Sequence, residues 1–291
     1  MMKRAHWLWV CFGFFGAWQV SAGGEVPENF RRENLVAWAI VPFDAVGRGP
    51  AERARLIREL GMRRCAYDWR VEHVPEFEDE IEAYGEEGIE YVAFWNEHEA
   101  AFELFEKHAM RPQVWKTLRT PNVEGQGARV AAAVEAMTPL AERTAAMGCP
   151  LGLYNHGGWG GEPENLVAVC EALREAGHDH VGIVYNFHHG HFHVDGFAES
   201  FDLMRPYLLC VNLNGMRDAE EVDVTVMENK IVPIGDGAHE RAMIGAIIES
   251  GYDGLVGIIG HRKDEDLAVT LRANLEGLQE ILEARIEYGG R

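Results

Sequence analysis

The sequence predicts a single α/β domain in which eight parallel strands alternate with eight helices and close into a (β/α)8 barrel. After residue 22, short apolar runs alternate with longer amphipathic stretches, a rhythm typical of a parallel sheet with helices packed outside it. The chain has 291 residues, and such a barrel commonly uses about 250 as one unit. No internal repeat, low-complexity tract or interdomain linker interrupts the sequence, so we expect one barrel domain over residues 23–291.

Apolar runs of strand length recur along the chain, and many of them contain β-branched or aromatic residues. The predicted strands are 35–43, 65–69, 89–95, 112–118, 150–156, 181–187, 207–213 and 255–260. The stretches between them carry apolar residues at helical spacing, and the first of these helices is followed by Gly61 as a stop signal. The predicted helices are 51–62, 77–88, 97–108, 128–148, 164–177, 197–206, 239–251 and 265–286.

An open, doubly wound sheet is the structural alternative. Such a sheet usually carries a glycine-rich phosphate loop after its first strand. Here the first strand runs into VPFDAVGRGP, residues 41–50, which lacks the G-x-G-x-x-G spacing. The eight predicted strand–helix units and the missing loop favour the barrel.

The N-terminus has the pattern of a secretory signal peptide over residues 1–22. A basic start, MMKR, precedes an apolar run over residues 6–18 and a small-residue cleavage site at residues 20–22. An uncleaved membrane anchor is the alternative, but Gln19 and Ser21 interrupt a run already short for a span of about 20 residues. We therefore expect a secreted or periplasmic protein without stable membrane association, whose mature chain begins at or near Gly23.

The charge balance excludes one class of partner. With 47 acidic and 27 basic residues the formal net charge is −20, and no Lys/Arg-rich stripe interrupts it, so we expect no nucleic acid as a partner.

Four cysteines remain after residue 22, widely spaced and without a C-x-x-C pair. This spacing favours buried thiols, with one disulfide as the alternative in an oxidising compartment.

In a barrel of this kind the active site lies at the carboxyl ends of the strands, so the residues just after each apolar run are the candidates. The strongest motif is YNFHHGHFH, residues 185–193, where four histidines follow one strand. Imidazole titrates near neutrality and binds divalent metals, which indicates an acid/base or ligand role, while some of the four support the others. The predicted catalytic residues are His188, His189, Glu97 and Lys116.

The polar residues at other strand ends indicate sugar binding. In YNHGGWGGEPENL, residues 154–166, the glycines allow close backbone approach and Trp159 offers a flat face for a sugar ring, although a plain connecting turn is an equal alternative. Asn212 and Asn214 alternate with period two, so both point inward and suit hydroxyl groups. The predicted substrate-binding residues are Asn155, Trp159, Asn186, Asn212, Asn214 and Asp236.

These strand ends together resemble the sugar phosphate isomerase/epimerase superfamily, the xylose isomerase-like barrels. YNHGGW is similar to the family's Y-H-N-H strand end, VGIVYNFHHGH to V-G-x-x-x-D-x-x-H, LLCVNLNG to H-x-K-D and PIGDG to P-x-G-x-G, and the resemblance runs from about residue 34 to the C-terminus. It implies a divalent metal (manganese, cobalt, zinc or magnesium) and substrates that are sugars, keto-sugars or related polyols.

The sequence departs from the family at the implied metal ligands. The family holds its metal with Glu, Asp, His and Glu at strands five to eight. The corresponding positions here are Asn155 with His156, Asn186, Asn212, and Gly260 with His261. Two alternatives follow: a metal site rebuilt from His156, His189 and His261, with Glu97 or Glu162 as further candidates, or a barrel that has lost its metal.

The resemblance and the strand-end residues predict an isomerase or epimerase that polarises a sugar carbonyl and moves a proton at the adjacent carbon. A keto-sugar lyase shares this first step, and a non-catalytic carbohydrate-binding barrel is the alternative from another class. An endonuclease of the same barrel family is disfavoured by the acidic charge and the export signal. We expect a neutral carbohydrate as the small-molecule partner, because Asp236 in PIGDG would repel a phosphate. The sequence does not indicate an oligomeric state.

Overall fold

The computed structural model describes residues 25–288 and shows a closed barrel of eight parallel strands in chain order, as predicted. The pairing of β1 with β8, in the register Val36 to Gly257, closes the ring. The strands are β1 Val36–Trp38, β2 Arg64–Tyr67, β3 Glu90–Trp95, β4 Gln113–Thr117, β5 Leu151–Tyr154, β6 Val181–Asn186, β7 Leu208–Leu213 and β8 Leu255–Ile259.

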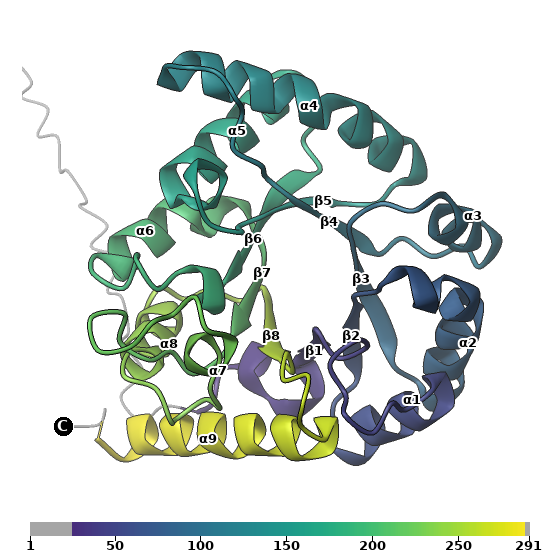
Figure 1. Cartoon of the computed structure of the whole chain (residues 1–291), viewed down its shortest axis with the longest axis vertical. Helices are drawn as coiled ribbons and strands as arrows, with labels where there is room; N and C mark the ends of the chain where they lie inside the picture. Colours follow the sequence, from purple (N-terminus) through teal and green to yellow (C-terminus); the bar gives the residue numbers. More distant parts are fainter. Residues whose placement is uncertain (1–24, 289–291) are drawn as a thin grey trace, which may run out of the picture.

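Helices form a ring outside the barrel (Figure 1). They are α1 Pro50–Glu59, α2 Phe77–Glu87, α3 Glu99–Lys107, α4 Gln126–Met147, α5 Pro163–Glu175, α6 Phe197–Met204, α7 Met227–Lys230, α8 Glu240–Glu249 and α9 Leu267–Tyr288. Short 3-10 helices are η1 Glu28–Phe30, η2 Arg32–Asn34, η3 Val71–Glu76, η4 Trp159–Gly161, η5 Phe187–His189 and η6 Arg205–Tyr207. The one-turn helix α7, which lies in the long connection after β7, was not predicted.

The first strand is much shorter than the predicted run of residues 35–43. It ends at Trp38 because Ala39 adopts a positive φ of 54°, a left-handed conformation that turns the chain out of the strand. The apolar residues that follow are buried without being in a strand, as Ile40 and Val41 show. The apolar run therefore indicates buried residues and not a continuous strand, and the strand prediction was wrong beyond residue 38.

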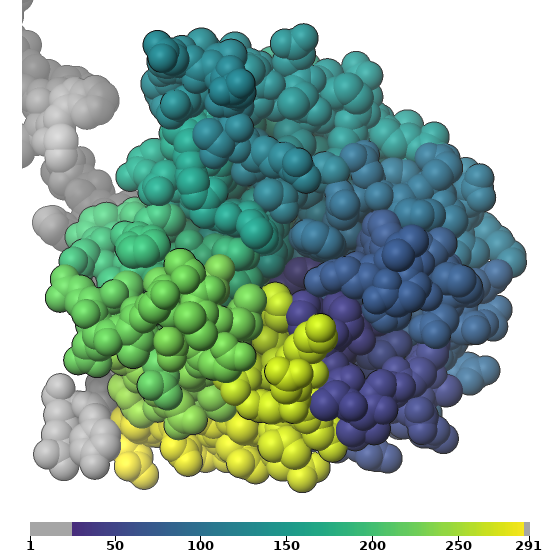
Figure 2. All heavy atoms as spheres, viewed as in Figure 1, coloured from purple at the N-terminus to yellow at the C-terminus, as the bar shows by residue number. Residues whose placement is uncertain are grey.

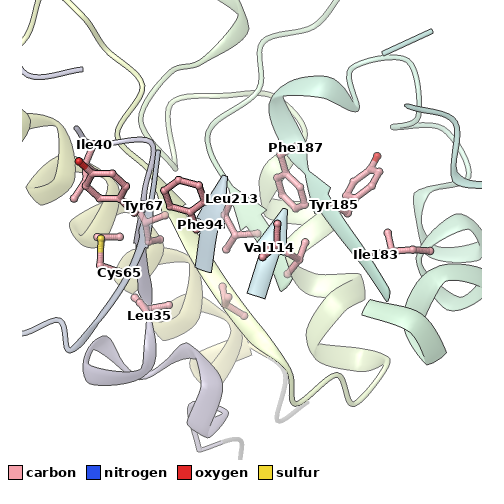
Figure 3. Packing of buried hydrophobic residues seen from close by; sticks show 14 of the residues in the cluster. Leu35, Ile40, Cys65, Tyr67, Phe94, Val114, Ile183, Tyr185, Phe187 and Leu213 are labelled. Carbon is pink, nitrogen blue, oxygen red and sulfur yellow. The ribbon is translucent and has the colours of Figure 1, made fainter. Parts of the chain in front are cut away.

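Alternate residues of strand β6 serve two separate packing layers. Along β6, Ile183 and Tyr185 pack outward under the helices, on one side of the strand (Figure 3), whereas Val184 belongs to the cluster inside the barrel. That interior is filled by large rings, Trp38, Trp115 and Tyr154, the first two with ring centroids 4.8 Å apart.

Two glycines make room for this filling. A Cβ at Gly152 would lie 2.9 Å from the Trp115 ring and 2.6 Å from Val184, and one at Gly257 would lie 1.9 Å from Asn212 Oδ1. The barrel interior is therefore a packed core, and any ligand must sit above it, at the strand ends.

The predicted signal peptide, residues 1–22, lies outside the described residues and stays a prediction. Within residues 25–288, no helix is both long enough and apolar enough to cross a membrane. The four cysteines in the described part of the chain are buried and unpaired, which agrees with the interpretation as buried thiols.

Candidate active site

A pocket of about 180 Å3 opens at the carboxyl ends of the strands, and the space-filling view is hollowed near its centre, where the first and last segments meet (Figure 2). This volume is below the range of about 300–1,000 Å3 for drug-sized ligands, and it suits a small molecule such as a monosaccharide. The lining residues are Trp38, Ala39, Phe43, Asp68, Arg70, Trp95, Tyr154, His156, His188, His189, Met227, Lys230 and His261.

The side of the pocket built by β1 to β3 combines aromatic rings with an arginine and a carboxylate. The Arg70 guanidinium lies 5.3 Å from the Phe43 ring centroid and 5.7 Å from that of Trp95. Asp68 follows β2, is only 3% exposed, and lies 3.9 Å from Arg70. Burial raises the pKa of Asp68 to about 6, against the pull of Arg70 and the Val41 backbone N–H.

The side built by β5, β6 and β8 presents imidazoles. The rings of His188 and His189 lie 3.8 Å apart, those of His156 and His189 4.2 Å, and the His261 ring lies 3.6 Å from that of Phe43. Burial lowers the pKa of His189 to about 2 and of His261 to about 4, and it holds the pKa of His188 well below its ordinary value. These imidazoles are therefore neutral at pH 7, so each ring offers one N–H donor and one acceptor nitrogen.

Lys230 enters this nitrogen-rich side from the end of α7. Its Nζ lies 3.2 Å from His189 Nδ1, so the ammonium donates to that nitrogen and the His189 proton is on Nε2. Among residues 25–288, no carboxylate lies within 4 Å of the Lys230 amine. Burial lowers the pKa of Lys230 below its ordinary value.

Two buried nitrogen atoms in the pocket wall have no hydrogen-bond partner in the described part of the chain: Trp38 Nε1 and His188 Nδ1. Their side chains are 2% and 3% exposed. A buried polar atom left unpaired costs about 1–3 kcal/mol, so native proteins rarely leave one without a role. Both atoms belong to residues that line the pocket, so a polar partner is missing in its wall.

The predicted substrate-binding asparagines form a separate cluster with no exposed surface, which we call the amide cluster: Asn155, Asn186 and Asn212. The Asn186 side-chain amide and its backbone N–H both donate to Asn155 Oδ1 at 2.8 Å, and the Asn212 amide donates to Asn186 Oδ1 at 2.8 Å. None of the three lines the pocket.

The remaining predicted residues divide between the pocket and its surroundings. His188 and His189, predicted as catalytic, line the pocket, and so do His156 and His261. The other predicted residues lie outside the pocket. Glu97 and Lys116 form an ion pair at 2.7 Å, and the Trp159 indole N–H donates to the Gln126 side chain. Asn214 is buried, and Asp236 is exposed.

Sequence reasoning missed several residues of the pocket wall. Asp68 carried a usable signal, because it is a carboxylate inside a short apolar run, CAYDW. Trp38 and Trp95 looked like ordinary core residues of predicted strands. Lys230 comes from α7, in the long connection after β7, and nothing in the neighbouring sequence marks it as a pocket residue.

A family model described as "Xylose isomerase-like TIM barrel" matches residues 49–283. The chain belongs to this family. The match covers most of the barrel and confirms the resemblance inferred from the strand ends. No curated protein matches the sequence.

Solved structures of the same fold cover most of this chain at low identity. The 3-keto-D-glucoside 4-epimerase of E. coli, in its apo form, is 16% identical with a TM-score of 0.61, over 85% of this chain and 98% of that one. A probable 3-DHS dehydratase of Bacillus anthracis is 12% identical, with a TM-score of 0.65 over 84% and 98%. A D-psicose 3-epimerase solved with D-fructose is 14% identical, with a TM-score of 0.57 over 88% and 99%. At these identities the likeness establishes the shared fold.

Other structures of this fold were solved with zinc or with magnesium, so the donor set of this chain can be tested against a metal. Amides occupy three of the implied ligand positions, and these amides are hydrogen-bonded to each other. Among residues 25–288, no group of three or more His, Cys, Asp or Glu side chains is arranged to hold a metal ion. The family's carboxylate site does not fit these residues, and ligation by His156, His189 and His261 stays a prediction.

Proposed function

We propose that the protein is an enzyme that moves a proton at the carbon next to the carbonyl of a monosaccharide-sized keto-sugar, as an isomerase or epimerase does. The observation that carries this proposal is the combination of a buried carboxylate, two cations and two unpaired nitrogen atoms around one pocket. The fold relatives named as sugar epimerases support the substrate class.

Each group of the pocket has a part in this reaction. Asp68, whose pKa of about 6 lies close to neutral pH, is suited to take the proton and return it. The Lys230 ammonium and the imidazole N–H groups polarise the carbonyl oxygen, where negative charge develops as the proton leaves. Phe43 and Trp95 supply flat apolar faces for the sugar ring.

We further propose that the sugar carries no phosphate. Arg70 lies beside Asp68 and over two aromatic rings, so Lys230 is the cation of the pocket wall without a carboxylate neighbour. A phosphate ester brings about two negative charges and needs more positive charge than this. Each keto-sugar is to be compared with its phosphate ester at low ionic strength; consistently tighter binding of the esters would contradict the proposal.

The reaction is tested by solvent exchange. A series of keto-sugars, D-fructose and a 3-keto-glucoside among them, is incubated with the protein in heavy water, and deuterium at the carbon next to the carbonyl is followed by NMR. We expect incorporation with the wild type and its loss in Asp68→Asn. Asp236→Asn, at an exposed carboxylate outside the pocket, is the matched control and should exchange as the wild type does.

The predicted metal and the predicted export have their own tests. If His156, His189 and His261 hold a divalent ion, elemental analysis finds it in the purified protein, and each single change to alanine lowers the occupancy. Full occupancy in all three variants would contradict this ligand set.

Export with cleavage predicts that N-terminal sequencing of the secreted protein starts at or near Gly23, and a start at Met1 would contradict it.

A further inference from the structure

The amine of Lys230, at the end of α7, has an environment unlike that of Lys116 on β4. Lys116 lies at the edge of the barrel and is held by Glu97 at 2.7 Å and Asn96 at 2.6 Å. Lys230 is half-buried in the pocket wall and has no carboxylate within 4 Å in the described residues. Its one recorded side-chain partner is His189 Nδ1, an acceptor that cannot stabilise the ammonium as a carboxylate does.

We propose that Lys230 is a covalent catalyst that forms an iminium, a protonated Schiff base, with the carbonyl carbon of the keto-sugar. The inference rests on the proposed function, because it names how that carbonyl is activated. A partly desolvated amine that has no carboxylate partner and shares its pocket with another cation is an environment in which lysine acts as a nucleophile toward carbonyls.

The step balances without a redox partner. The Lys230 ammonium releases one proton to the solvent, and the free amine adds to the carbonyl carbon, forming a C–N bond. The carbonyl oxygen takes up protons and leaves as water, so that ammonium and ketone give iminium and one water with the charge unchanged. The positive iminium then draws electrons from the adjacent C–H bond, and Asp68 in the same pocket accepts that proton. Return of the proton and hydrolysis reverse the sequence.

A covalent role for Lys230 is also consistent with amides at the positions where the family implies metal ligands. At the strand ends where the family implies metal ligands, this chain has neutral amides bonded to each other, which cannot polarise a carbonyl. An iminium carries a full positive charge on the former carbonyl carbon and nitrogen, and it does the work of a Lewis acid. A reactive amine therefore fits a pocket whose strand ends offer no carboxylate set.

The test is chemical trapping in the full-length folded protein. Borohydride added with D-fructose or the 3-keto-glucoside reduces an iminium to a stable amine, and peptide mapping by mass spectrometry locates it. Pentane-2,4-dione is a second probe, because it forms an ultraviolet-absorbing vinylogous amide with a reactive lysine and needs no sugar recognition. We expect one dominant adduct, on Lys230, which is lost in Lys230→Arg and kept in Lys116→Arg.

The outcomes separate this inference from the proposed function. Lys230→Arg keeps the cation, and its thermal midpoint and circular dichroism check that it folds. Labelling spread over surface lysines, or equal labelling of Lys230→Arg, overturns the covalent role. If the wild type exchanges deuterium without a trapped adduct, Lys230 acts through its charge alone and the proposed function stands. If neither exchange nor trapping occurs with any probe, both proposals fail.

Discussion

Two polar clusters lie at the strand ends of this barrel, and they are built on opposite principles. In the amide cluster of Asn155, Asn186 and Asn212, the three side chains bond to each other and have no exposed surface. In the imidazole side of the pocket, His188 has a buried nitrogen without a partner. A fully bonded buried network rigidifies a structure, whereas an unpaired buried polar atom in a pocket wall calls for a functional explanation. From this difference we expect the amides to contribute stability and the imidazoles to take part in the proposed chemistry.

The largest expected effect follows from breaking the amide cluster at its centre. Asn186→Leu removes the acceptor of the Asn212 amide and leaves that buried amide unpaired, whereas Asn155 Oδ1 loses the side-chain donor and keeps the backbone N–H of residue 186. At about 1–3 kcal/mol for an unpaired buried group, we expect the free energy of unfolding to fall by about 1–3 kcal/mol. Urea unfolding measures it, and an unchanged midpoint would show that the cluster is not a stabilising network.

The matching change on the imidazole side should affect deuterium exchange strongly and stability little. His188→Leu removes a ring whose Nδ1 has no partner among the described residues, so we expect the free energy of unfolding to stay within about 1 kcal/mol of the wild type. Deuterium exchange into the keto-sugar should fall by about 100-fold, because a group that contacts the reacting oxygen is gone. A variant that is unstable yet fully active once folded would reverse the comparison.

Acid should lower the stability of the protein through its buried histidines. The folded-state pKa values of His189, His191 and His261 lie below the unfolded value of 6.5. Their contribution to the free energy of unfolding is therefore fully present above pH 6.5. It is lost at lower pH, because the unfolded chain takes up protons there that the folded chain does not. Asp68, whose pKa is raised, works in the opposite direction and is outnumbered. We expect unfolding free energy to drop between pH 7 and pH 5, and the drop to be smaller by about 1–2 kcal/mol in His191→Gln. An equal drop in the variant would refute this assignment.

The smallest effect is expected outside both clusters. Glu97→Gln breaks an ion pair with Lys116 in which the glutamate side chain is half exposed, and such pairs contribute about 0–1 kcal/mol. Stability and exchange should both stay near the wild type. A loss of exchange comparable to that of His188→Leu would restore Glu97 and Lys116 as the catalytic residues that the sequence predicts.

The sequence predicted the barrel and one side of the pocket because both leave local signals. Alternating burial produces the apolar runs, and HHGH stands out within a single strand end. The roles within the pocket depend on distant partners instead. Asn186 looks like a sugar ligand until Asn155 and Asn212 are seen to satisfy it, and Lys230 reaches His189 across 41 positions of the chain. Hydrogen bonds between strands and the folding of long loops are not encoded in any one segment's periodicity.

The central claim, proton transfer by a buried carboxylate next to a sugar carbonyl, is tested most directly by the pH dependence of deuterium exchange. Asp68 must be ionised to accept the proton, and its pKa is about 6, so the rate in wild type should rise through pH 6 and level off above it. Asp68→Asn should show no such rise. Keto-sugar that binds in the pocket without label incorporation at any pH would contradict the account and identify a carbohydrate-binding barrel.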